Sequence, residues 1–255
     1  MKALILAAGY ATRLYPLTKD FPKPLLEVGD RTILDHLIDQ MAGLEALEQI
    51  VLITNHRFVP FFERWRETRR SRKPVAVLDD GTTSNEDRLG AVGDLRFALE
   101  HADLGHDLLV TAADNILRFP LPEFVAAVQA RPASHVCVHH VDDPERLRRT
   151  GVVVLDEKDR VVEFAEKPRK PKTHWGVPPL YIFPRSTLSR VAVYLAAGGS
   201  PEAPGHFIEW LCRHEPVFAY RIRGSILDIG TPQSLEAARR SVRPQPHRRP
   251  AEPRL

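Results

Sequence analysis

The sequence predicts an α/β protein, and three observations lead to this fold class. The chain has 255 residues, of which 43% are hydrophobic and 27% charged, as in globular domains with a sizeable core. Apolar runs alternate with helical patterns through the first half, and shorter strand patterns dominate the second half. Strand–helix alternation builds parallel sheets with right-handed crossovers. We therefore expect a Rossmann-like, three-layer α/β/α arrangement around a predominantly parallel mixed sheet.

In the first half, expected strands are apolar runs, and expected helices repeat apolar residues every three to four positions. Residues 2–8 read KALILAA, a continuous apolar run that is typical of a strand buried on both faces. Residues 32–44 place Ile33, Leu37 and Met41 at helical spacing. The later elements are strands at 49–54, 74–78 and 107–113, and helices near 57–70 and 89–101.

The second half has a different rhythm, with short strands close together. The turn at 156–159, DEKD, favours a hairpin between two of them. We expect strands at 135–141, 151–156, 160–168, 178–183 and 216–223, helices near 186–197 and 205–213, and a last helix after Pro232. These elements predict one folded unit over 1–240, with a first part of about 1–130 and a second part of about 131–225.

The net charge of +3 is concentrated at the end of the chain. Residues 241–255 hold four arginines and one glutamate, which gives +3 and leaves residues 1–240 formally neutral. A neutral body lacks the basic surface of a nucleic-acid-binding protein, so no nucleic-acid partner is expected. The segment 241–255 is rich in arginine and proline with little to bury, which predicts a disordered tail.

The apolar runs and the cysteines of the sequence predict the cellular compartment of the protein. No apolar run is long enough to span a bilayer, and the N-terminal strand lacks a cleavage-type site, so no membrane partner is expected. Cys137 and Cys212 stand alone in apolar segments without zinc-site spacing. We expect two reduced core thiols in a cytoplasmic protein.

The strongest chemical signal lies at residues 6–29. The first strand ends in a loop of small residues, Ala7, Ala8 and Gly9, whose backbone N–H groups can approach an anion closely. Arg13 follows at once, Lys23 lies ten positions later, and prolines stiffen the segment between them. Two cations beside exposed amides at the carboxyl end of a strand suit a polyphosphate.

This segment resembles the signature of the sugar-1-phosphate nucleotidyltransferase family, G-x-G-T-R-L-x-P-L-T followed by P-K-P-L-L. Here it reads GYATRLYPLT from Gly9 to Thr18, which includes Thr12, and then PKPLL from Pro22. The departure is Ala11, where the family usually has glycine. If the backbone there needs a positive φ, alanine carries strain, which leaves the loop shape open.

Three later segments follow in the family's order, so the resemblance covers about residues 1–240. Asp114-Asn115 is similar to the family's G-D-N, and Asp228 lies in a segment similar to D-I/T-G-T-P. The resemblance implies that Asp114 and Asp228 bind Mg²⁺ as cofactor. Glu166-Lys167-Pro168 resembles the family's E-K-P. The resemblance implies that Lys167 holds the phosphate of the sugar phosphate and Glu166 accepts sugar hydroxyls, with Gly151 meeting the sugar.

The resemblance implies a nucleotidyltransferase fold and a Mg²⁺-assisted reaction that joins an NTP to a sugar 1-phosphate and releases pyrophosphate. The NTP-binding part is then 1–130 and the sugar-phosphate-binding part 131–225. We expect the main catalytic roles at Arg13, Lys23, Asp114 and Asp228. The expected NTP-binding residues are Ala7, Ala8, Gly9, Thr12, Arg13, Asn85, Asp87 and Arg88, and the expected sugar-phosphate-binding residues are Lys23, Gly151, Glu166 and Lys167.

Substrate identity stays open at this stage. Family members specific for thymidylyl or uridylyl groups usually read the base with a glutamine, and the corresponding stretch 79–91 has none. Thr83, Ser84, Asn85, Asp87 and Arg88 offer donors and acceptors there instead. Candidate acceptor-pocket residues, which can equally be core, are Trp175, Gly176, Tyr181, His206, Phe207 and Trp210.

Several alternative functions are weighed against this interpretation. A cytidylyltransferase acting on a choline-, polyol- or inositol-type phosphate stays open, as does a catalytically silent nucleotide-sugar-binding homologue. The chain lacks the R-M-G-x-x-K tendency of molybdopterin-type enzymes, the Asp-x-Asp of glycosyltransferases, and the NAD and P-loop motifs. Association into a homo-oligomer is left open, because no interface pattern is readable.

Overall fold

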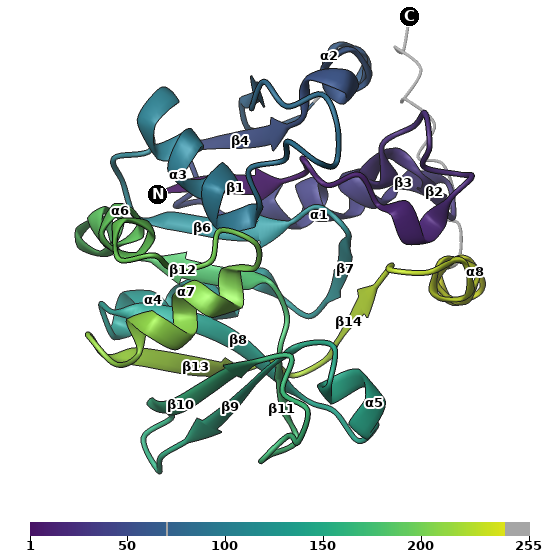
Figure 1. Ribbon diagram of the computed structural model, residues 1–255. Coiled ribbons are helices and arrows are strands. Elements are labelled where there is room, and N and C mark those ends of the chain that lie inside the picture. The colour runs from purple at the N-terminus through teal and green to yellow at the C-terminus, as the bar shows by residue number, and fades with distance from the viewer. Residues whose placement is uncertain (70, 243–255) are drawn as a thin grey trace, which may run out of the picture.

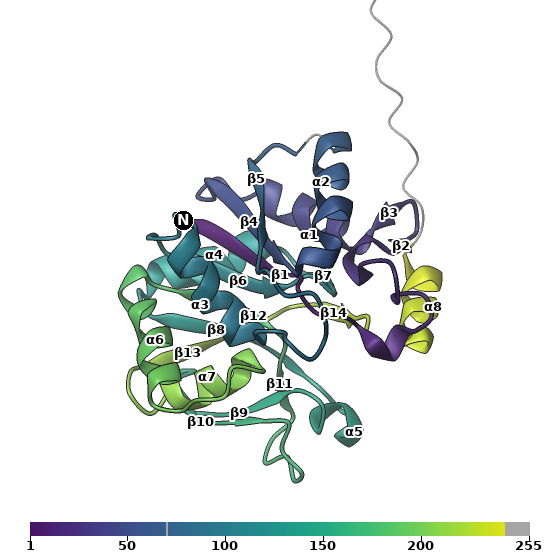
Figure 2. The ribbon, with the colours of Figure 1, turned by 45° about the horizontal axis from the view of Figure 1, so that its top comes forward.

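The computed structural model describes residues 1–69 and 71–242, and within them ten strands form one sheet. The strand order is β10-β9-β11-β8-β12-β6-β1-β4-β5, with β13 paired to β8 (Figure 1; β5 is labelled in Figure 2). The strands are β1 Lys2–Leu6, β4 Gln49–Thr54, β5 Val75–Asp79, β6 Leu108–Ala112, β8 Ser134–His140, β9 Gly151–Leu155, β10 Val161–Glu166, β11 Trp175–Val177, β12 Leu180–Phe183 and β13 Val217–Arg221.

The centre of the sheet is parallel, as the alternating pattern of the first half predicts. β1 lies between β4 and β6 and is parallel to both, and β4 is parallel to β5. Side chains on both faces of β1 are fully buried, which explains its continuous apolar run: Ala3, Leu4 and Ile5 are each 0% exposed. The loops after β1 and β6 therefore leave the sheet side by side at its carboxyl edge.

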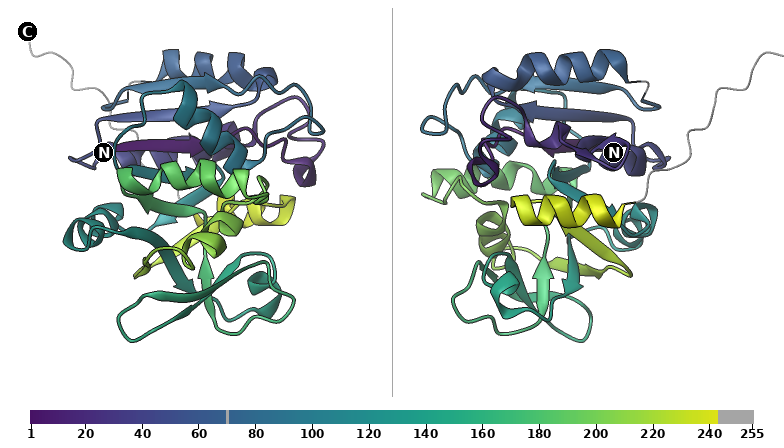
Figure 3. Two further views of the ribbon diagram at one scale, coloured as in Figure 1. Left: turned by 60° about the vertical axis from the view of Figure 1, so that its left-hand side comes forward. Right: turned by 90° about the vertical axis from the view of Figure 1, so that its right-hand side faces the viewer.

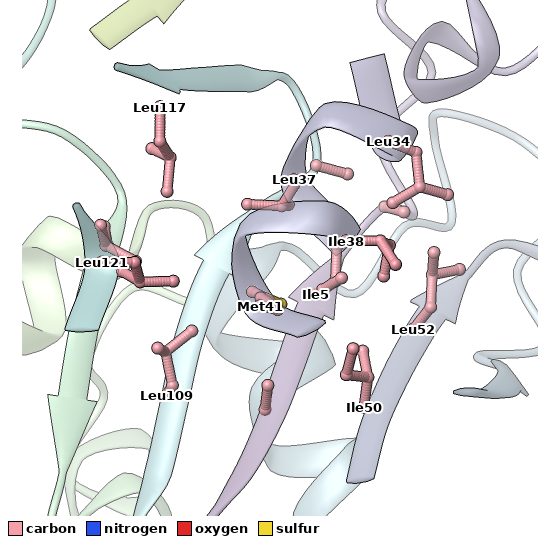
Figure 4. Packing of buried hydrophobic residues seen from close by; sticks show 14 of the residues in the cluster. Ile5, Leu34, Leu37, Ile38, Met41, Ile50, Leu52, Leu109, Leu117 and Leu121 are labelled. Carbon is pink, nitrogen blue, oxygen red and sulfur yellow. The ribbon is translucent and has the colours of Figure 1, made fainter. Parts of the chain in front are cut away.

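Helices cover both faces of this sheet, so the three-layer α/β/α prediction is confirmed. One face packs against α1 Ile33–Ala42, α2 Val59–Thr68 and α4 Leu121–Ala130. Figure 4 shows Leu37, Ile38 and Met41 of α1 over strand residues such as Ile5 and Leu109. The other face packs against α3 Ala91–His101, α6 Ser189–Ala196 and α7 Pro204–Leu211 (Figure 1).

The second half extends the same sheet with antiparallel strands. β12 is antiparallel to both β6 and β8, and β9 and β10 form the expected hairpin around 156–159. The sequence patterns gave no sign of α4, of the short helix α5 Pro144–Leu147, or of the three-residue strand β11. The two parts predicted at 1–130 and 131–225 therefore share one sheet.

A small layer outside the main sheet brings together segments that are far apart in the chain. β7 Asn115–Arg118 and β14 Ser225–Asp228 form an antiparallel pair, and β2 Glu27–Val28 pairs with β3 Arg31–Thr32. Helix α8, Pro232–Ser241, packs on both pairs through a cluster that includes Val28, Ile116 and Leu235. It faces the viewer in the right-hand panel of Figure 3. Thr231 caps α8, as its position before proline predicts.

Helix α8 includes Ser241, so the boundary predicted at 240/241 falls inside its last turn. The remainder of the predicted tail, residues 243–255, lies outside the described residues. Both cysteines are free thiols, with Cys137 buried as expected and Cys212 partly buried. None of the helices in the described part of the chain is long and apolar enough to cross a membrane.

Candidate active site

The loop after β1 is anchored by hydrogen bonds to its neighbours while its middle stays open. The Ala7 N–H donates to the Ile53 carbonyl at 2.9 Å, and the Asn55 side-chain amide donates to the Ala8 carbonyl at 2.9 Å. Ala7 and Ala8 are each only 5% exposed. Gly9 is exposed, and a side chain there would meet nothing within 4 Å. The loop therefore has room for a ligand against its backbone.

Ala11 adopts the left-handed conformation, with φ 47° and ψ 42°. The conditional prediction about this position is thus confirmed: the backbone needs a positive φ that glycine would adopt freely. A non-glycine residue here carries strain of about 1–2 kcal/mol. The Thr18 hydroxyl donates to the Ala11 carbonyl at 2.8 Å and helps to hold the turn, which is followed by a 3₁₀ turn bearing exposed Thr12 and Arg13.

Two carboxylates from distant parts of the chain meet at this edge. Asp114 lies in the turn after β6, and Asp228 ends β14 opposite Asn115 of β7. The Ile229 N–H donates to the Asp114 carbonyl at 3.2 Å, which ties the two segments together. Figure 2 shows β14 lying next to β7 on its way to α8. The convergence of the two aspartates, predicted from the motifs, is present in the structure.

The electrostatics of Asp228 reflect this crowding. The residue is exposed to solvent on one side, but protein atoms surround its carboxyl group on the others. This partial burial, followed by the nearby charge of Asp114, raises the pKa of Asp228. The charges of Lys23, Arg13 and Arg146 oppose the increase. A carboxylate pair that repels itself in this way is a favourable place for added positive charge.

Two of the predicted cations face the carboxylates. The Lys23 Nζ lies 2.7 Å from Asp114 Oδ2, and the lysine is only 7% exposed. A Cβ at Gly230 would lie 3.4 Å from Arg13 Nη2 and 3.6 Å from Asp228 Oδ1, so the guanidinium and the carboxylate flank the same glycine. The structure therefore brings Arg13, Lys23, Asp114 and Asp228 together. The roles expected for them stay predictions.

The donor set fits a hard divalent cation. Asp114 and Asp228 supply carboxylate oxygens, the ligands that Mg²⁺ prefers, and Mg²⁺ usually keeps water and substrate phosphates in its other positions. No group of three or more His, Cys, Asp or Glu side chains within residues 1–69 and 71–242 is arranged to hold a metal ion. The protein would thus provide two ligands rather than a complete cage.

In the second half of the chain, the expected sugar-phosphate residues Gly151 and Lys167 lie close to Glu166. Its side chain is only 9% exposed, and this burial raises the pKa of Glu166. Lys167 Nζ lies 3.6 Å from Glu166 Oε1, while most of the lysine side chain is exposed. Lys167 also has a positive φ of 48°, a strained conformation of the kind that often marks functional sites.

Two glycines lie beside the Glu166 carboxylate. A Cβ at Gly205 would lie 1.8 Å from Glu166 Oε2, so this glycine makes space for the carboxylate, whereas a Cβ at Gly151 would lie 3.4 Å from the same oxygen and 2.5 Å from Phe164 Cζ, so Gly151 makes space for the Phe164 ring. The charge of His206 lowers the pKa of Glu166, which places this histidine near the carboxylate as an acceptor-pocket candidate. The contact of Gly151 with the sugar, which the resemblance implies, stays a prediction, and Gly205, which directly precedes His206, was not singled out from the sequence.

The other acceptor-pocket candidates divide between core and surface. Tyr181 and Phe207 are 3% and 1% exposed and belong to the core packed against α7, so they do not line a pocket. Trp175 is half-buried with Arg221 over its ring, and Trp210 stacks on His214. Gly176 is packed tightly, since a Cβ would lie 2.9 Å from Val141.

The loop expected to meet the nucleobase is held by its own side chains. Asp87 accepts hydrogen bonds from Thr83 and Ser84, including the Ser84 N–H at 2.8 Å, and these bonds lower the pKa of Asp87 to about 2. Arg88 donates to the Asn85 carbonyl at 2.6 Å and to Glu202 at 2.8 Å. Asp87 and Arg88 therefore shape the loop, and their contact with an NTP stays a prediction.

Sequence reasoning missed several polar residues at this edge. Tyr10 is 5% exposed with its hydroxyl beside Thr82, and burial raises the pKa of Tyr10. Asp94 is buried in the first turn of α3. Arg146, on α5, lies close enough to Asp228 to lower its pKa. An aspartate within an apolar helical face is a readable signal for Asp94, whereas nothing in the sequence relates Arg146 to Asp228.

A surface hollow of about 310 Å³ lies away from the candidate site, between α3 and α6, with Leu99, Arg185 and Ala192 in its lining. The Arg185 N–H donates to Asp107, just before β6, so this hollow lies at the amino edge of the sheet. The charged groups gather instead at the carboxyl edge, where parallel α/β sheets bind ligands.

Comparison with known sequences supports the motifs. The family described as nucleotidyl transferase matches residues 2–245. The chain is 27% identical over 233 residues to the bifunctional protein GlmU of Methanocaldococcus jannaschii, covering 91% of this chain and 52% of that protein. It is 27% identical over 239 residues to the UTP–glucose-1-phosphate uridylyltransferase AglF of Haloferax volcanii, covering 93% and 95%. It is 30% identical over 247 residues to probable mannose-1-phosphate guanylyltransferase 1 of Oryza sativa subsp. japonica, covering 91% and 62%.

Comparison with solved structures supports the fold. A putative glucose-1-phosphate thymidylyltransferase from Bacillus anthracis superposes with a TM-score of 0.80 at 22% identity, covering 97% of each chain. A UDP-glucose pyrophosphorylase complexed with UDP-glucose superposes with a TM-score of 0.77 at 18% identity, covering 94% of this chain and 97% of that one. The chain spans about half the length of the GlmU protein it matches.

Proposed function

Since this chain belongs to the nucleotidyl transferase family, we propose that it transfers a nucleotidyl group from an NTP to a sugar 1-phosphate and releases pyrophosphate. Two of the proteins to which it is similar are named for such reactions with glucose 1-phosphate or mannose 1-phosphate. The observation that carries the proposal is the meeting of Asp114 and Asp228 beside Lys23 and Arg13 at the carboxyl edge of β1 and β6.

The reaction is an in-line displacement at the α-phosphorus. An oxygen of the sugar phosphate forms the new P–O bond, and the bond to the β-phosphate oxygen breaks, so pyrophosphate leaves with the electron pair. The attacking oxygen is already anionic, so the chain needs no strong general base. Positioning and charge neutralisation are its main contributions.

The NTP half of the site performs the charge neutralisation. Backbone N–H groups near Ala8 and Gly9 approach the triphosphate through the open part of the loop. Arg13 binds the triphosphate and stabilises the leaving pyrophosphate. Asp114 and Asp228 would hold Mg²⁺, which would supply positive charge at the reacting phosphoryl group.

The acceptor half positions the nucleophile. Lys167, whose side chain is largely exposed, binds the phosphate of the sugar phosphate, and Lys23 reduces repulsion between the two anionic substrates. Glu166 accepts hydrogen bonds from sugar hydroxyls, and the backbone of Gly151, close to the Glu166 carboxylate, is the second contact proposed for the sugar. The buried position of Glu166 makes such bonds strong, because little water competes for the carboxylate.

The test is a pyrophosphate-release assay with each of the common NTPs against a panel of sugar 1-phosphates, with choline, polyol and inositol phosphates included. We expect Mg²⁺-dependent release with at least one NTP–sugar phosphate pair. Turnover restricted to the non-sugar phosphates would contradict the acceptor class. Ligand binding without pyrophosphate release from any pair would contradict the enzymatic function.

A matched aspartate pair of variants sharpens this test. Asp228→Asn removes one carboxylate of the site, whereas Asp103→Asn removes an 81% exposed carboxylate that pairs with Lys2 at the opposite edge of the sheet. Only Asp228→Asn should lose activity. Equal activity of both variants would contradict the role proposed for Asp228.

A further inference from the structure

Two buried aspartates lie at the two ends of the loop that joins β5 to α3. Asp80 directly follows β5, and Asp94 lies in the first turn of α3. Each is only 6% exposed. Carboxylates are seldom buried to this extent without a cationic partner. Within residues 1–69 and 71–242, neither forms a salt bridge with a lysine, arginine or histidine. Some other interaction must therefore stabilise the two buried carboxyl groups.

The oxygens of the pair are used unequally. Asp80 Oδ1 accepts hydrogen bonds from both the N–H and the hydroxyl of Thr82, each at 2.7 Å. Asp80 Oδ2 and Asp94 Oδ1 are buried, and no N–H or hydroxyl group of the described residues donates a hydrogen bond to either oxygen. The two carboxyl groups are nevertheless close enough to hydrogen-bond each other. One proton between them would satisfy both oxygens.

We propose that Asp80 and Asp94 share a proton, and that this carboxylic acid–carboxylate hydrogen bond fixes the loop 80–90 on α3. The assignment of the loop to the nucleobase end of the NTP site rests on the proposed function. The proton-sharing itself rests only on burial and geometry. Asp80 and Asp94 are positioning residues for nucleotide binding, acting through the loop rather than by touching the phosphates.

The surroundings favour a single proton at neutral pH. Burial, followed by the charge of Asp80, raises the pKa of Asp94 to about 8, and burial also raises the pKa of Asp80. Charged and titratable groups on the adjoining elements do not neutralise the pair. On β5, Asp79 adds negative charge and lies 2.6 Å from His56. The others are Tyr10 on the first loop, Asp87 within the loop 80–90, and Arg88, which pairs with Glu202 near the start of α3.

The sign of the pH dependence follows from this arrangement. The folded protein holds a proton on Asp94 up to about pH 8, whereas an unfolded aspartate releases it near pH 4. Stability from this group is therefore greatest at low pH and declines as pH rises from about 4 to 8. Where the folded state holds this proton and the unfolded state does not, the equilibrium constant for unfolding increases by up to about tenfold per pH unit. Above about pH 8 both carboxylates are ionised and repel each other, which loosens the loop.

The experiment compares Asp94→Asn with Asp94→Ala. The asparagine keeps a donor toward Asp80 but cannot ionise, whereas the alanine removes the donor. We expect the KM for the NTP of the wild-type enzyme to rise by about tenfold above pH 8, the value for one lost buried hydrogen bond. The Asp94→Asn variant should have a flat profile over this range. Asp94→Ala should have the raised KM at every pH, with the KM for the sugar phosphate unchanged.

Two substrate-free measurements separate this proposal from the proposed function. The infrared band of a protonated carboxylic acid should be present at pH 7 in wild type, absent in Asp94→Asn, and retained in the Asp103→Asn control. The free energy of unfolding, measured with urea, should decline less steeply between pH 4 and 8 in Asp94→Asn than in wild type. The difference in slope should correspond to one proton. Absence of the band, or identical slopes in wild type and Asp94→Asn, would overturn proton-sharing. Parallel KM profiles despite the band would overturn the positioning role.

Discussion

Replacing Gly205 with alanine should separate acceptor binding from folding. Gly205 lies in the first turn of α7, and an alanine Cβ would lie 1.8 Å from Glu166 Oε2, 2.7 Å from Glu166 Cδ and 3.1 Å from Phe164 Cε1. Ordinary contacts begin at 3.4 Å, so the carboxylate oxygen must move by about 1.6 Å. The clashing group is the end of a flexible side chain, so the backbone can stay in place.

The two effects of this substitution have different magnitudes. Alanine in place of glycine stabilises a helix by about 1 kcal/mol, which offsets the work of displacing the Glu166 carboxylate. The free energy of unfolding should therefore change by less than about 1 kcal/mol. Under the proposed function a displaced carboxylate would lose its hydrogen bond to the sugar, and bonds to charged groups contribute about 1.5–3 kcal/mol. That corresponds to about a 10- to 100-fold lower kcat/KM for the sugar phosphate.

Steady-state kinetics with each substrate varied in turn, together with urea unfolding, provides the assay. The matched control is Gly105→Ala, because a Cβ at Gly105 meets nothing within 4 Å. The control should keep both KM values, and Gly205→Ala should change only the parameters for the sugar phosphate. An unchanged kcat/KM for the sugar phosphate, or an equal loss for the NTP, would refute the contact between Glu166 and the acceptor.

Further predictions concern the phosphate end of the site. Asp114→Asn should lower turnover by about 10²-fold, as loss of one preorganised charge often does, and turnover titrated with Mg²⁺ would show it; near-normal turnover would contradict metal binding there. Arg13→Ala should lower turnover by a similar factor of about 10², measured by pyrophosphate release. Ala11→Gly should raise the free energy of unfolding by up to about 1 kcal/mol, because relief of left-handed strain of about 1–2 kcal/mol exceeds the entropy cost of about 0.4–1 kcal/mol. A urea midpoint below that of wild type would refute this.

Much of the fold could be predicted because its signals are local. The apolar run of β1 and the helical spacing of α1 each depend on neighbouring residues alone, and both elements form as expected. Asp114 and Asp228 could be singled out as well, but through the resemblance of their segments to the family motifs rather than through a local folding signal. Their convergence depends on the pairing of β7 with β14, which no local pattern indicates.

The remainder of the site could not be predicted because it depends on packing between distant segments. Tyr181 and Phe207 have side chains that could bind a sugar, but the layers above and below the sheet bury them. Gly205 matters only because α7 lies against the end of β10, where Glu166 is. Asp87 has the chemistry of a base-reading residue, yet its oxygens are used within its own loop.

One short segment, residues 200–206, connects the two halves of the proposed site. The first amides of α3 donate to its carbonyls, Ala91 N–H to Glu202 at 3.1 Å and Val92 N–H to Pro201 at 2.8 Å. Gly90 permits this contact, because a Cβ there would lie 2.5 Å from the Pro201 oxygen. Three positions after Glu202, Gly205 packs against the Glu166 carboxylate. Since backbone hydrogen bonds and a glycine contact fix both ends, the loop 80–90 and the Glu166 carboxylate, which the proposed function assigns to the nucleobase and the acceptor, share one support. In-line transfer needs such shared support, because small displacements between two bound phosphates cost large factors in rate.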